Sequence, residues 1–292
     1  MIQIIKASHM GFCFGVRDAI ALAETEAKKG PATILGDLVH NPSVLESLRE
    51  KGIRFAHSLA DVETDRLIIT AHGTSDRSRD SIRRSGFETL DATCPLVRHA
   101  HTTLQSLVRD GYHPVIIGKR GHIEVRGLAG DFESYDIVLS EEEVKAISPR
   151  AKFGVIAQTT QPIARVKHLV SVMKKEFPNS EVRFEDTVCH PTKLRQEAVK
   201  NLAQTCDLVL VVGGKDSNNT AELVRAAELF TPNVYHIEAA SEILVSWLNG
   251  VRRLGITAGT STPDQVIVAV ENRVREIETL LLTPSPLESV TA

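Results

Sequence analysis

Three of the four cysteines share a setting that suits a common metal centre. Each stands on a turn before a segment of helical periodicity, and a glycine that opens a polar loop follows 23 or 24 residues later. The pairs are Cys13 with Gly36, Cys94 with Gly118, and Cys189 with Gly213. Thiolates bind soft metals and iron–sulfur clusters. We expect these cysteines to be ligands of one centre; the competing interpretation is three unrelated buried cysteines followed by glycine-rich turns.

The fourth cysteine has different surroundings. Cys206 stands at the mouth of the apolar run 208–212, and free cysteine is among the most buried residue types. We expect it to be a structural core residue. The cysteines are too scattered in sequence for a small disulfide framework or for the closely paired ligands that mark most structural zinc sites.

Three converging thiolates favour an iron–sulfur cluster over hard cations such as magnesium or calcium. A cubane cluster normally takes four cysteines, so three would leave one iron with an open position. An open position indicates chemistry on a substrate rather than simple electron transfer. Zinc held by three cysteines and a water molecule is the alternative.

Polar residues on the loops of the three units point to recognition of an anion. His40, His72 and His122 stand on loops of the first two units. The corresponding loops of the third unit carry hydroxyl and amide side chains, namely Ser217, Asn218, Asn219, Thr260 and Ser261. Backbone N–H groups of the glycine loops would add further donors. This set of mostly uncharged donors, without an arginine clamp, suits a diphosphate.

Glu124 lies two residues beyond His122, and in an extended segment both side chains would face the same side. A carboxyl group among apolar neighbours can have its pKa raised enough to donate a proton. A solvent-exposed surface glutamate is the competing interpretation. Thr159, on the polar loop of the same unit, is a candidate to hold a hydroxyl group or a water molecule.

Strand-like runs alternate with helical segments along the chain, which predicts an α/β fold with mostly parallel sheets. Strands are expected at 2–5, 67–70, 114–117, 208–212 and 253–257, and helices at 17–29, 96–109, 192–204 and 264–281. The repeat of cysteine, glycine loop and polar loop predicts three small lobes around a pseudo-threefold axis, with the metal centre in the middle. Their expected bounds are 1–85, 86–180 and 181–281, followed by a flexible tail at 282–292.

The composition excludes several classes of function. The chain has 292 residues, 34 Lys+Arg against 37 Asp+Glu, and a net charge of −3 at pH 7, so it lacks the basic excess of nucleic-acid binding proteins. Aromatic residues make up 4%, too few for a base-stacking surface. No apolar run approaches the roughly 20 residues of a membrane span, and the strand-like start at Ile2 leaves no room for a signal peptide. We expect a cytoplasmic protein without nucleic-acid or membrane partners.

These residues resemble the family of 4-hydroxy-3-methylbut-2-enyl diphosphate reductases, which catalyse the last step of the non-mevalonate pathway of isoprene biosynthesis. The resemblance extends over nearly the whole chain and rests on short blocks in a specific order. The blocks are GFCFGV at 11–16, DATCP at 91–95, GHIEV at 121–125, QTT at 158–160, DTVC at 186–189, RQEA at 195–198 and AGTSTPD at 258–264.

The resemblance implies an oxidoreductase with a [4Fe-4S] cluster held by Cys13, Cys94 and Cys189. It implies that the allylic hydroxyl of the substrate binds the open iron and that a ferredoxin or flavodoxin delivers two electrons. Cleavage of the C–O bond would give isopentenyl and dimethylallyl diphosphate. Glu124 would belong to the proton relay and Thr159 would orient the departing hydroxyl. The implied diphosphate ligands are His40, His72, His122, Ser217, Asn219 and Ser261, and Asn218 can also donate to a phosphate.

The chain departs from the family's pattern at three places. Asn218 stands where the family usually has a second serine, and His190-Pro191 replace the small or polar residue and alanine that usually follow the third cysteine. Lys119, Arg120 and Arg126 make the second loop more basic. These departures leave two alternatives open: a paralogous open-cubane enzyme with another substrate, resembling the radical enzyme of diphthamide synthesis, and a non-catalytic iron–sulfur sensor.

Overall fold

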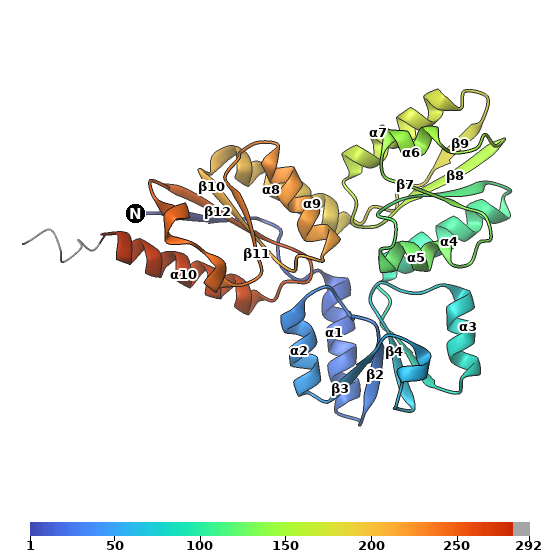
Figure 1. Cartoon of the computed structure of the whole chain (residues 1–292), viewed down its shortest axis with the longest axis horizontal. Coiled ribbons are helices and arrows are strands. Elements are labelled where there is room, and N and C mark those ends of the chain that lie inside the picture. Colours follow the sequence, from blue (N-terminus) through green and yellow to red (C-terminus); the bar gives the residue numbers. More distant parts are fainter. Residues whose placement is uncertain (283–292) are drawn as a thin grey trace, which may run out of the picture. The chain divides into compact units, whose positions relative to one another are not determined.

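The computed structural model describes residues 1–282, which form three parallel four-stranded sheets (Figure 1). The chain divides into two compact units: one combines Met1–Phe12 with the chain from Leu194 onward, and the other is Cys13–Lys193. The expected flexible tail lies outside the described residues, except for Leu282. No helix within residues 1–282 has both the length and the apolar character that a membrane span needs.

The first sheet has the strand order β3-β2-β4-β5 and lies in the unit Cys13–Lys193. Its strands are β2 (Ala32–Leu35), β3 (Ile53–Ala56), β4 (Arg66–Ile69) and β5 (Glu88–Asp91). Its helices are α1 (Phe14–Ala27), α2 (Pro42–Glu50) and α3 (Asp76–Arg84), with a 3-10 turn at Leu59–Asp61. Figure 1 shows α1 and α2 on one side of these strands and α3 on the other.

The second sheet belongs to the same unit and has the order β7-β6-β8-β9. Its strands are β6 (His113–Ile117), β7 (Asp136–Val138), β8 (Lys152–Ala157) and β9 (Glu181–Phe184). The helices are α4 (Pro95–Arg109), α5 (Ile123–Ala129), α6 (Glu141–Lys145) and α7 (Ile163–Glu176). Apolar residues of α4 and α5 pack on one face of the sheet and those of α7 on the other.

The third sheet has the order β1-β12-β10-β11 and forms the other unit. Its strands are β1 (Gln3–Lys6), β10 (Leu208–Val212), β11 (Val234–Ile237) and β12 (Arg253–Ala258). The helices are α8 (His190–Thr205), which begins in the other unit, α9 (Asn218–Glu228) and α10 (Asp264–Leu282), with 3-10 turns at Ala240–Glu242 and Val245–Leu248. α8 and α9 cover one face and α10 covers the other.

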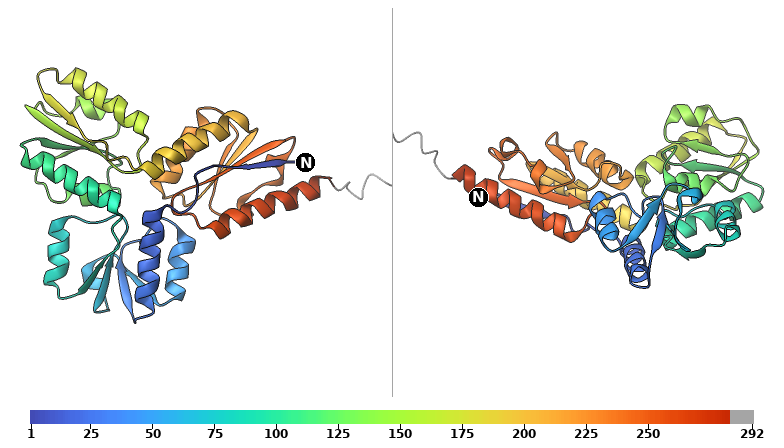
Figure 2. Two further views of the ribbon diagram at one scale, coloured as in Figure 1. Left: turned by 180° about the vertical axis from the view of Figure 1, so that it is seen from behind. Right: turned by 60° about the horizontal axis from the view of Figure 1, so that its bottom comes forward.

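The three sheets confirm the expected α/β class with three lobes, and they repeat one strand order. In each sheet, the strand after a cysteine-bearing turn lies inside and the next strand lies outside it, and in the first two sheets the last strand forms the opposite edge. The third sheet completes this pattern with β1, which pairs in parallel with β12 from Gln3↔Arg253 to Lys6↔Ile256. The left view of Figure 2 shows the dark-blue first strand among the orange strands of this lobe.

The sheets divide the chain at points other than the expected lobe boundaries. β1 belongs to the third sheet rather than to the first lobe, β5 remains with the first sheet, and β9 remains with the second. The reason is that each lobe has a fourth, edge strand that precedes the next cysteine. The expected bounds group each cysteine with the strand before it, whereas that strand belongs to the preceding lobe.

The central strands are apolar because parallel sheets with helices on both faces bury both faces of each strand. All five residues of β10 are buried, and so are Phe153–Ala157 of β8. Among the edge strands, β9 alternates instead between exposed and half-buried positions. These rigid sheets hold the loops at the carboxyl ends of their strands, where the candidate site residues stand.

Leu254→Ala tests the assignment of β1 to the third sheet. Leu254 is fully buried on β12 and lies opposite Ile4 of β1, so the variant should lose about 2–5 kcal/mol of unfolding free energy. Hydrogen exchange should show faster exchange in residues 3–6 together with β10 and α10. Leu67→Ala, equally buried on β4, is the matched control and should leave residues 3–6 protected. Exchange of residues 3–6 that followed Leu67→Ala instead would contradict the assignment.

Candidate functional site

The three cysteines of the repeat occupy the same structural position. Cys13 is the N-cap of α1, Cys94 is the N-cap of α4, and Cys189 immediately precedes α8. A helix N-terminus presents unpaired N–H groups and a positive end of the helix dipole, both of which stabilise a thiolate. All three thiols are free and half-buried. Cys206, by contrast, is 8% exposed and packs in the core under β10, so the prediction of a structural cysteine is confirmed.

Cys94 and the turn after Cys13 are in direct contact. A Cβ atom added to Gly15, two residues beyond Cys13, would overlap the sulfur of Cys94 and lie 3.1 Å from its Cβ. Burial raises the pKa of the Cys94 thiol, the N–H groups of Leu96 and Val97 oppose this effect, and negative charge on Cys13 and on Glu124 adds to it. The start of α1 therefore requires glycine because it lies against the second thiol.

Cys189 lies in the same electrostatic environment. Its sulfur is 3.0 Å from the hydroxyl of Thr192 on the first turn of α8. Burial raises the pKa of the Cys189 thiol to about 11; hydrogen bonds from Thr192 lower it, and negative charge on Glu124 and Cys13 raises it. Pro191 is the second residue of α8, where a helix does not need the N–H that proline lacks, so the unusual His190-Pro191 pair is compatible with the helix start.

The donor set fits a cluster better than a single ion. Among residues 1–282, no three His, Cys, Asp or Glu side chains converge so as to hold one metal ion. Tetrahedral zinc needs its thiolates at about 2.3 Å from a single point. In a cubane each cysteine binds a different iron, so the sulfurs stay apart. Three free thiols at helix N-termini, near enough to interact by charge, match that requirement.

Glu124 and Thr159 form a buried pair, and the charge of Glu124 acts on both Cys94 and Cys189. The carboxylate accepts the N–H of Thr159 at 2.6 Å and its hydroxyl at 3.0 Å, and Glu124 is only 2% exposed. Burial raises the pKa of Glu124 to about 7, and the two hydrogen bonds from Thr159 oppose that rise. The competing interpretation, a surface glutamate, is wrong. At a pKa near 7, the carboxyl group can both hold and release a proton at neutral pH.

The expected extended segment around Glu124 is wrong in form. His122 is the N-cap of α5, and its ring nitrogen Nδ1 accepts the N–H of Glu124 at 3.2 Å. Glu124 is therefore on the first turn of a short helix. The Gly121-His122 turn, with Gly121 at φ 83°, ends in a capping histidine, and this local hydrogen bond sets the helix start. His122 and Glu124 are neighbours because of this helix cap, and not because an extended segment turns both side chains to one side.

The three loop histidines come together in one cluster. Ring centroids of His40 and His72 lie 4.4 Å apart, those of His40 and His122 5.3 Å, and those of His72 and His122 5.7 Å. Burial lowers the pKa of His72 well below its usual value, and charges on the other two rings lower it further. Burial, His40, Lys119 and Arg126 lower the pKa of His122 to about 4. An anion placed among the rings would offset this mutual repulsion.

His72 also carries an orphaned donor or acceptor. Among the described residues, its buried Nδ1 atom has no hydrogen-bond partner. Native proteins pair nearly all buried polar atoms, so such an atom marks a place for a ligand or water. The cluster therefore has the composition of a binding site for an uncharged or anionic oxygen.

The polar residues expected from the third sequence repeat also gather at one place, within the third lobe. Ser217 is the N-cap of α9 and accepts the N–H of Thr220 at 3.3 Å. Asn218, Asn219 and Ser261 are all buried, and both side-chain polar atoms of Asn219 lack a partner within the described residues. A Cβ at Gly259, on the polar loop, would be 3.7 Å from the Asn219 amide nitrogen. The start of α9 and the polar loop are therefore neighbours.

Comparisons with known proteins agree with this geometry. Residues 4–275 match the family described as LytB protein. The chain belongs to the LytB family. A relative from Aquifex aeolicus is 38% identical over 95% of this chain and 97% of its own length, and one from Geobacter metallireducens is 36% identical over 94% and 98%. Both are named 4-hydroxy-3-methylbut-2-enyl diphosphate reductase, so this LytB chain is an enzyme of the oxidoreductase class.

Solved structures of such reductases share the fold. One, titled as the terminal enzyme of the non-mevalonate pathway, is 37% identical and covers 94% of this chain and 100% of its own, with a TM-score of 0.66. The reductase from Plasmodium falciparum is 28% identical and covers 98% of this chain and 89% of its own, with a TM-score of 0.87. Both confirm the resemblance that the sequence motifs indicated.

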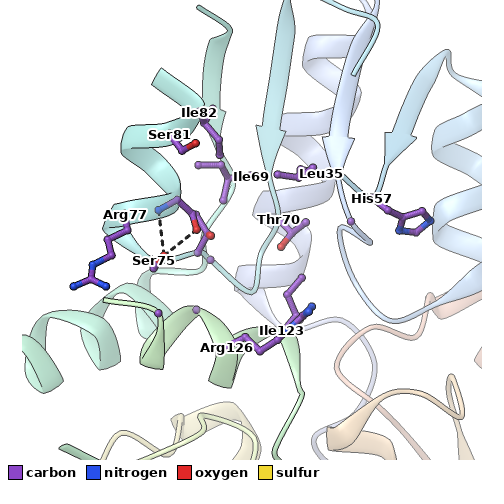
Figure 3. A pocket seen from close by; sticks show the side chains of 16 residues that line it. Leu35, His57, Ile69, Thr70, Ser75, Arg77, Ser81, Ile82, Ile123 and Arg126 are labelled. Carbon is purple, nitrogen blue, oxygen red and sulfur yellow. Dashed lines mark hydrogen bonds between the residues drawn. The ribbon is translucent and has the colours of Figure 1, made fainter. Parts of the chain in front are cut away.

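A cavity of about 530 Å³ lies beside the histidine cluster of this LytB chain. Figure 3 shows Leu35 and Ile69 of the first sheet facing it, with Ile123 and Arg126 of α5 on the opposite side. None of the residues expected in the site lines this cavity. The cavity adjoins the loops of the site without including the side chains assigned to it.

Gln158 is a site residue that sequence reasoning passed over. It is fully buried, and its side-chain oxygen accepts the N–H of Lys119 at 3.0 Å and an amide N–H of Gln161 at 3.1 Å. It thus ties the glycine loop to the polar loop that carries Thr159. The available signal was its position in the QTT block, where a polar residue directly follows the apolar run Phe153–Ala157.

The raised pKa of Glu124 predicts a pH-dependent contribution to stability in the metal-free chain. The folded state binds this proton more tightly than the unfolded state, so the contribution is complete below pH 4.5 and is lost as pH rises through 7. Urea unfolding gives the free energy of unfolding of the native chain and of Glu124→Gln. The native value minus the variant value should be up to about 3 kcal/mol smaller at pH 7.5 than at pH 4.5. His72 and His122 titrate in the opposite sense, but both chains keep them. A difference that did not change with pH would contradict the assignment.

Proposed function

We propose that the chain reduces 4-hydroxy-3-methylbut-2-enyl diphosphate to isopentenyl and dimethylallyl diphosphate. One observation carries this proposal: within the unit Cys13–Lys193, three free thiols interact by charge with each other or with a buried carboxyl group of pKa about 7. Names of the relatives supply the substrate. The overall change consumes two electrons and two protons and releases the hydroxyl group as water.

Cys13, Cys94 and Cys189 would hold a [4Fe-4S] cluster. When bound, the cluster supplies single electrons and an open iron position for the substrate hydroxyl. The chain contributes helix N-termini that favour thiolates, and the N–H groups of Leu96 and Val97 approach the Cys94 sulfur. Such N–H groups stabilise negative charge on the sulfur and tune the reduction potential.

Glu124 would deliver the proton that leaves with the hydroxyl. Hydroxide is a poor leaving group, and protonation converts it to water. The carboxyl group is suited to this step because its pKa matches neutral pH and because Thr159 fixes both of its oxygens. When Glu124 is protonated, the hydroxyl of Thr159 is free to turn toward the substrate oxygen and hold it in place.

The three histidines would bind the diphosphate. Neutral imidazoles donate one hydrogen bond each, and the lowered pKa values of His72 and His122 keep them neutral before the ligand arrives. Bound diphosphate would favour protonation of either ring. The proposed partners in the third lobe are Ser217, Asn218, Asn219 and Ser261, of which Asn219 has two orphaned polar atoms.

Electrons would come from a ferredoxin or flavodoxin. The proposed setting is the cytoplasm, where cysteines stay reduced, and the four free cysteines are consistent with it. The buried Glu124 and the histidine cluster favour the reductase over a non-catalytic sensor, which would need neither a proton donor nor an anion site.

Single replacements of the four cysteines test the cluster ligands. Cys13→Ser, Cys94→Ser and Cys189→Ser should each lose most of the iron, sulfide and visible absorption of anaerobically prepared protein, because a hydroxyl is a poor substitute for a soft thiolate. Cys206→Ser is the matched control and should keep the full cluster. The ligand assignment fails if Cys206→Ser loses the cluster while one of the other three retains it intact.

Glu124→Gln tests the proton donor. The amide keeps the shape of the side chain but has no transferable proton, so kcat per bound cluster should fall by about 10²–10⁴ with little change in KM. Glu26→Gln is the control, since Glu26 is buried on α1 and paired with Arg66; it should lower stability but not kcat. Retention of more than about a tenth of kcat by Glu124→Gln would assign the proton to another group.

A further inference from the structure

An aspartate ties together both ends of the Cys94 turn. Asp91, the last residue of β5, accepts the N–H of Thr93 at 2.9 Å through one carboxylate oxygen. The other oxygen accepts from the guanidinium of Arg98, on the first turn of α4, at 3.1 Å, and from Arg79 of α3. The carboxylate therefore connects the chain before Cys94 to the helix that follows it.

The turn at Cys189, between β9 and α8, has the same set of contacts. One oxygen of Asp186 accepts the N–H of Val188 at 3.1 Å, and the other accepts from the ammonium of Lys193 at 2.7 Å. In both turns the acid stands three residues before the cysteine and the cation four residues after it. The two turns thus share one set of contacts although the residues between acid and cysteine differ, Ala-Thr in one and Thr-Val in the other.

The cysteines of these two turns are also held alike by their backbones. The N–H of Cys94 donates to the carbonyl of Ala71 at 3.0 Å, and that of Cys189 donates to the carbonyl of Thr159 at 3.0 Å. Ala71 and Thr159 each lie two residues beyond an inner strand, β4 and β8. The place of each sulfur is thus set by the neighbouring loop and by the aspartate that closes the turn.

The first cysteine turn lacks the acid. Met10 stands three residues before Cys13, although Arg17 is present four residues after it. A thioether cannot accept the strong hydrogen bonds that a carboxylate accepts from N–H and guanidinium groups. The three turns, equivalent in the fold, therefore differ in how they are closed.

We propose that Asp91 and Asp186 are positioning residues that fix Cys94 and Cys189 as cluster ligands, whereas the Cys13 turn works without a carboxylate. The inference rests on the proposed ligand role of the cysteines. A carboxylate near a thiol opposes its ionisation, so these aspartates do not act by activating sulfur. Their negative charge is balanced by Arg79, Arg98 or Lys193, and their effect is geometric.

Release of iron to a chelator, from anaerobically loaded protein, tests the proposal without using turnover. Asp91→Ala and Asp186→Ala should each release iron at least about tenfold faster than the native protein, because each loses hydrogen bonds made by a charged group. Asp207→Ala is the matched control: Asp207 also accepts two backbone N–H groups, those of Arg252 and Arg253, at 2.8 Å, but in the third lobe. Equal release rates in all three variants and the native protein would overturn the proposal.

A conservative pair of variants separates positioning from general stability. Arg98→Lys gives the Cys94 turn the acid–lysine pair that the Cys189 turn already has, and it should release iron at the native rate. Arg98→Gln removes the cation and should release iron several times faster. If Asp91→Ala does not fold, the two Arg98 variants and Asp91→Asn test the proposal in its place. Asp91→Asn keeps an acceptor for the Thr93 N–H. Equal rates for Arg98→Lys and Arg98→Gln would overturn the role of the carboxylate bridge.

Hydrogen exchange of the metal-free chain provides a second measurement. Asp91→Ala should speed exchange at the Cys94 amide and leave the amides of Cys13 and Cys189 unchanged. Uniformly faster exchange across the unit would indicate general destabilisation and would overturn the proposal. Native protein that bound no iron would refute the proposed function instead, and the exchange result would still decide whether Asp91 holds the turn.

Discussion

Every strand pairing in the described sheets is parallel, so the chain does not return through a hairpin there and crosses over instead, in most cases through an α-helix. In this fold three of those crossovers also change sheets. The edge strand before each cysteine belongs to one sheet, and the helix after it packs on the next. The cysteines occupy these changes of sheet, each at the start of the helix that follows.

The polar groups of the site depend on the same rigid frame, because burial has opposite effects on acids and bases. Desolvation keeps Glu124 protonated near neutral pH and keeps His72 and His122 unprotonated. The acid therefore stores a proton near neutral pH while these two histidines stay uncharged, and Lys119 and Arg126 are the fixed cations close by. Under the proposed function, an anionic substrate would meet both hydrogen-bond donors and these cations. Gly15 contributes by close packing against Cys94, and the buried Gln158 contributes by hydrogen bonds between two loops.

The sequence was sufficient for the fold class, and it singled out residues that the structure brings together within each unit, but it did not show how their surroundings are built. Spacing between cysteines and glycines revealed a repeat because each turn must end a strand and start a helix. It did not reveal β1, since a short strand at the chain start carries no mark of the sheet it joins. Periodicity also misjudged the segment after His122, where one hydrogen bond from the Glu124 N–H to a ring nitrogen begins a helix. The shared spacing of Asp91 and Asp186 from their cysteines is present in the sequence, but only their contacts suggest the role proposed for them.

The pairing of β1 with β12 has a consequence for the way the protein is made. Residue 3 pairs with residue 253, so the third sheet stays incomplete until most of the chain has been synthesised. The first two sheets, by contrast, draw their strands from the continuous stretch 32–184 and can close while the ribosome is still working. Bringing the first strand to its partner means closing a loop of nearly the whole chain, a slow step that topology imposes. The segment that leads into Cys13 therefore reaches its final place only when the third sheet closes, after the unit Cys13–Lys193 has all of its own strands.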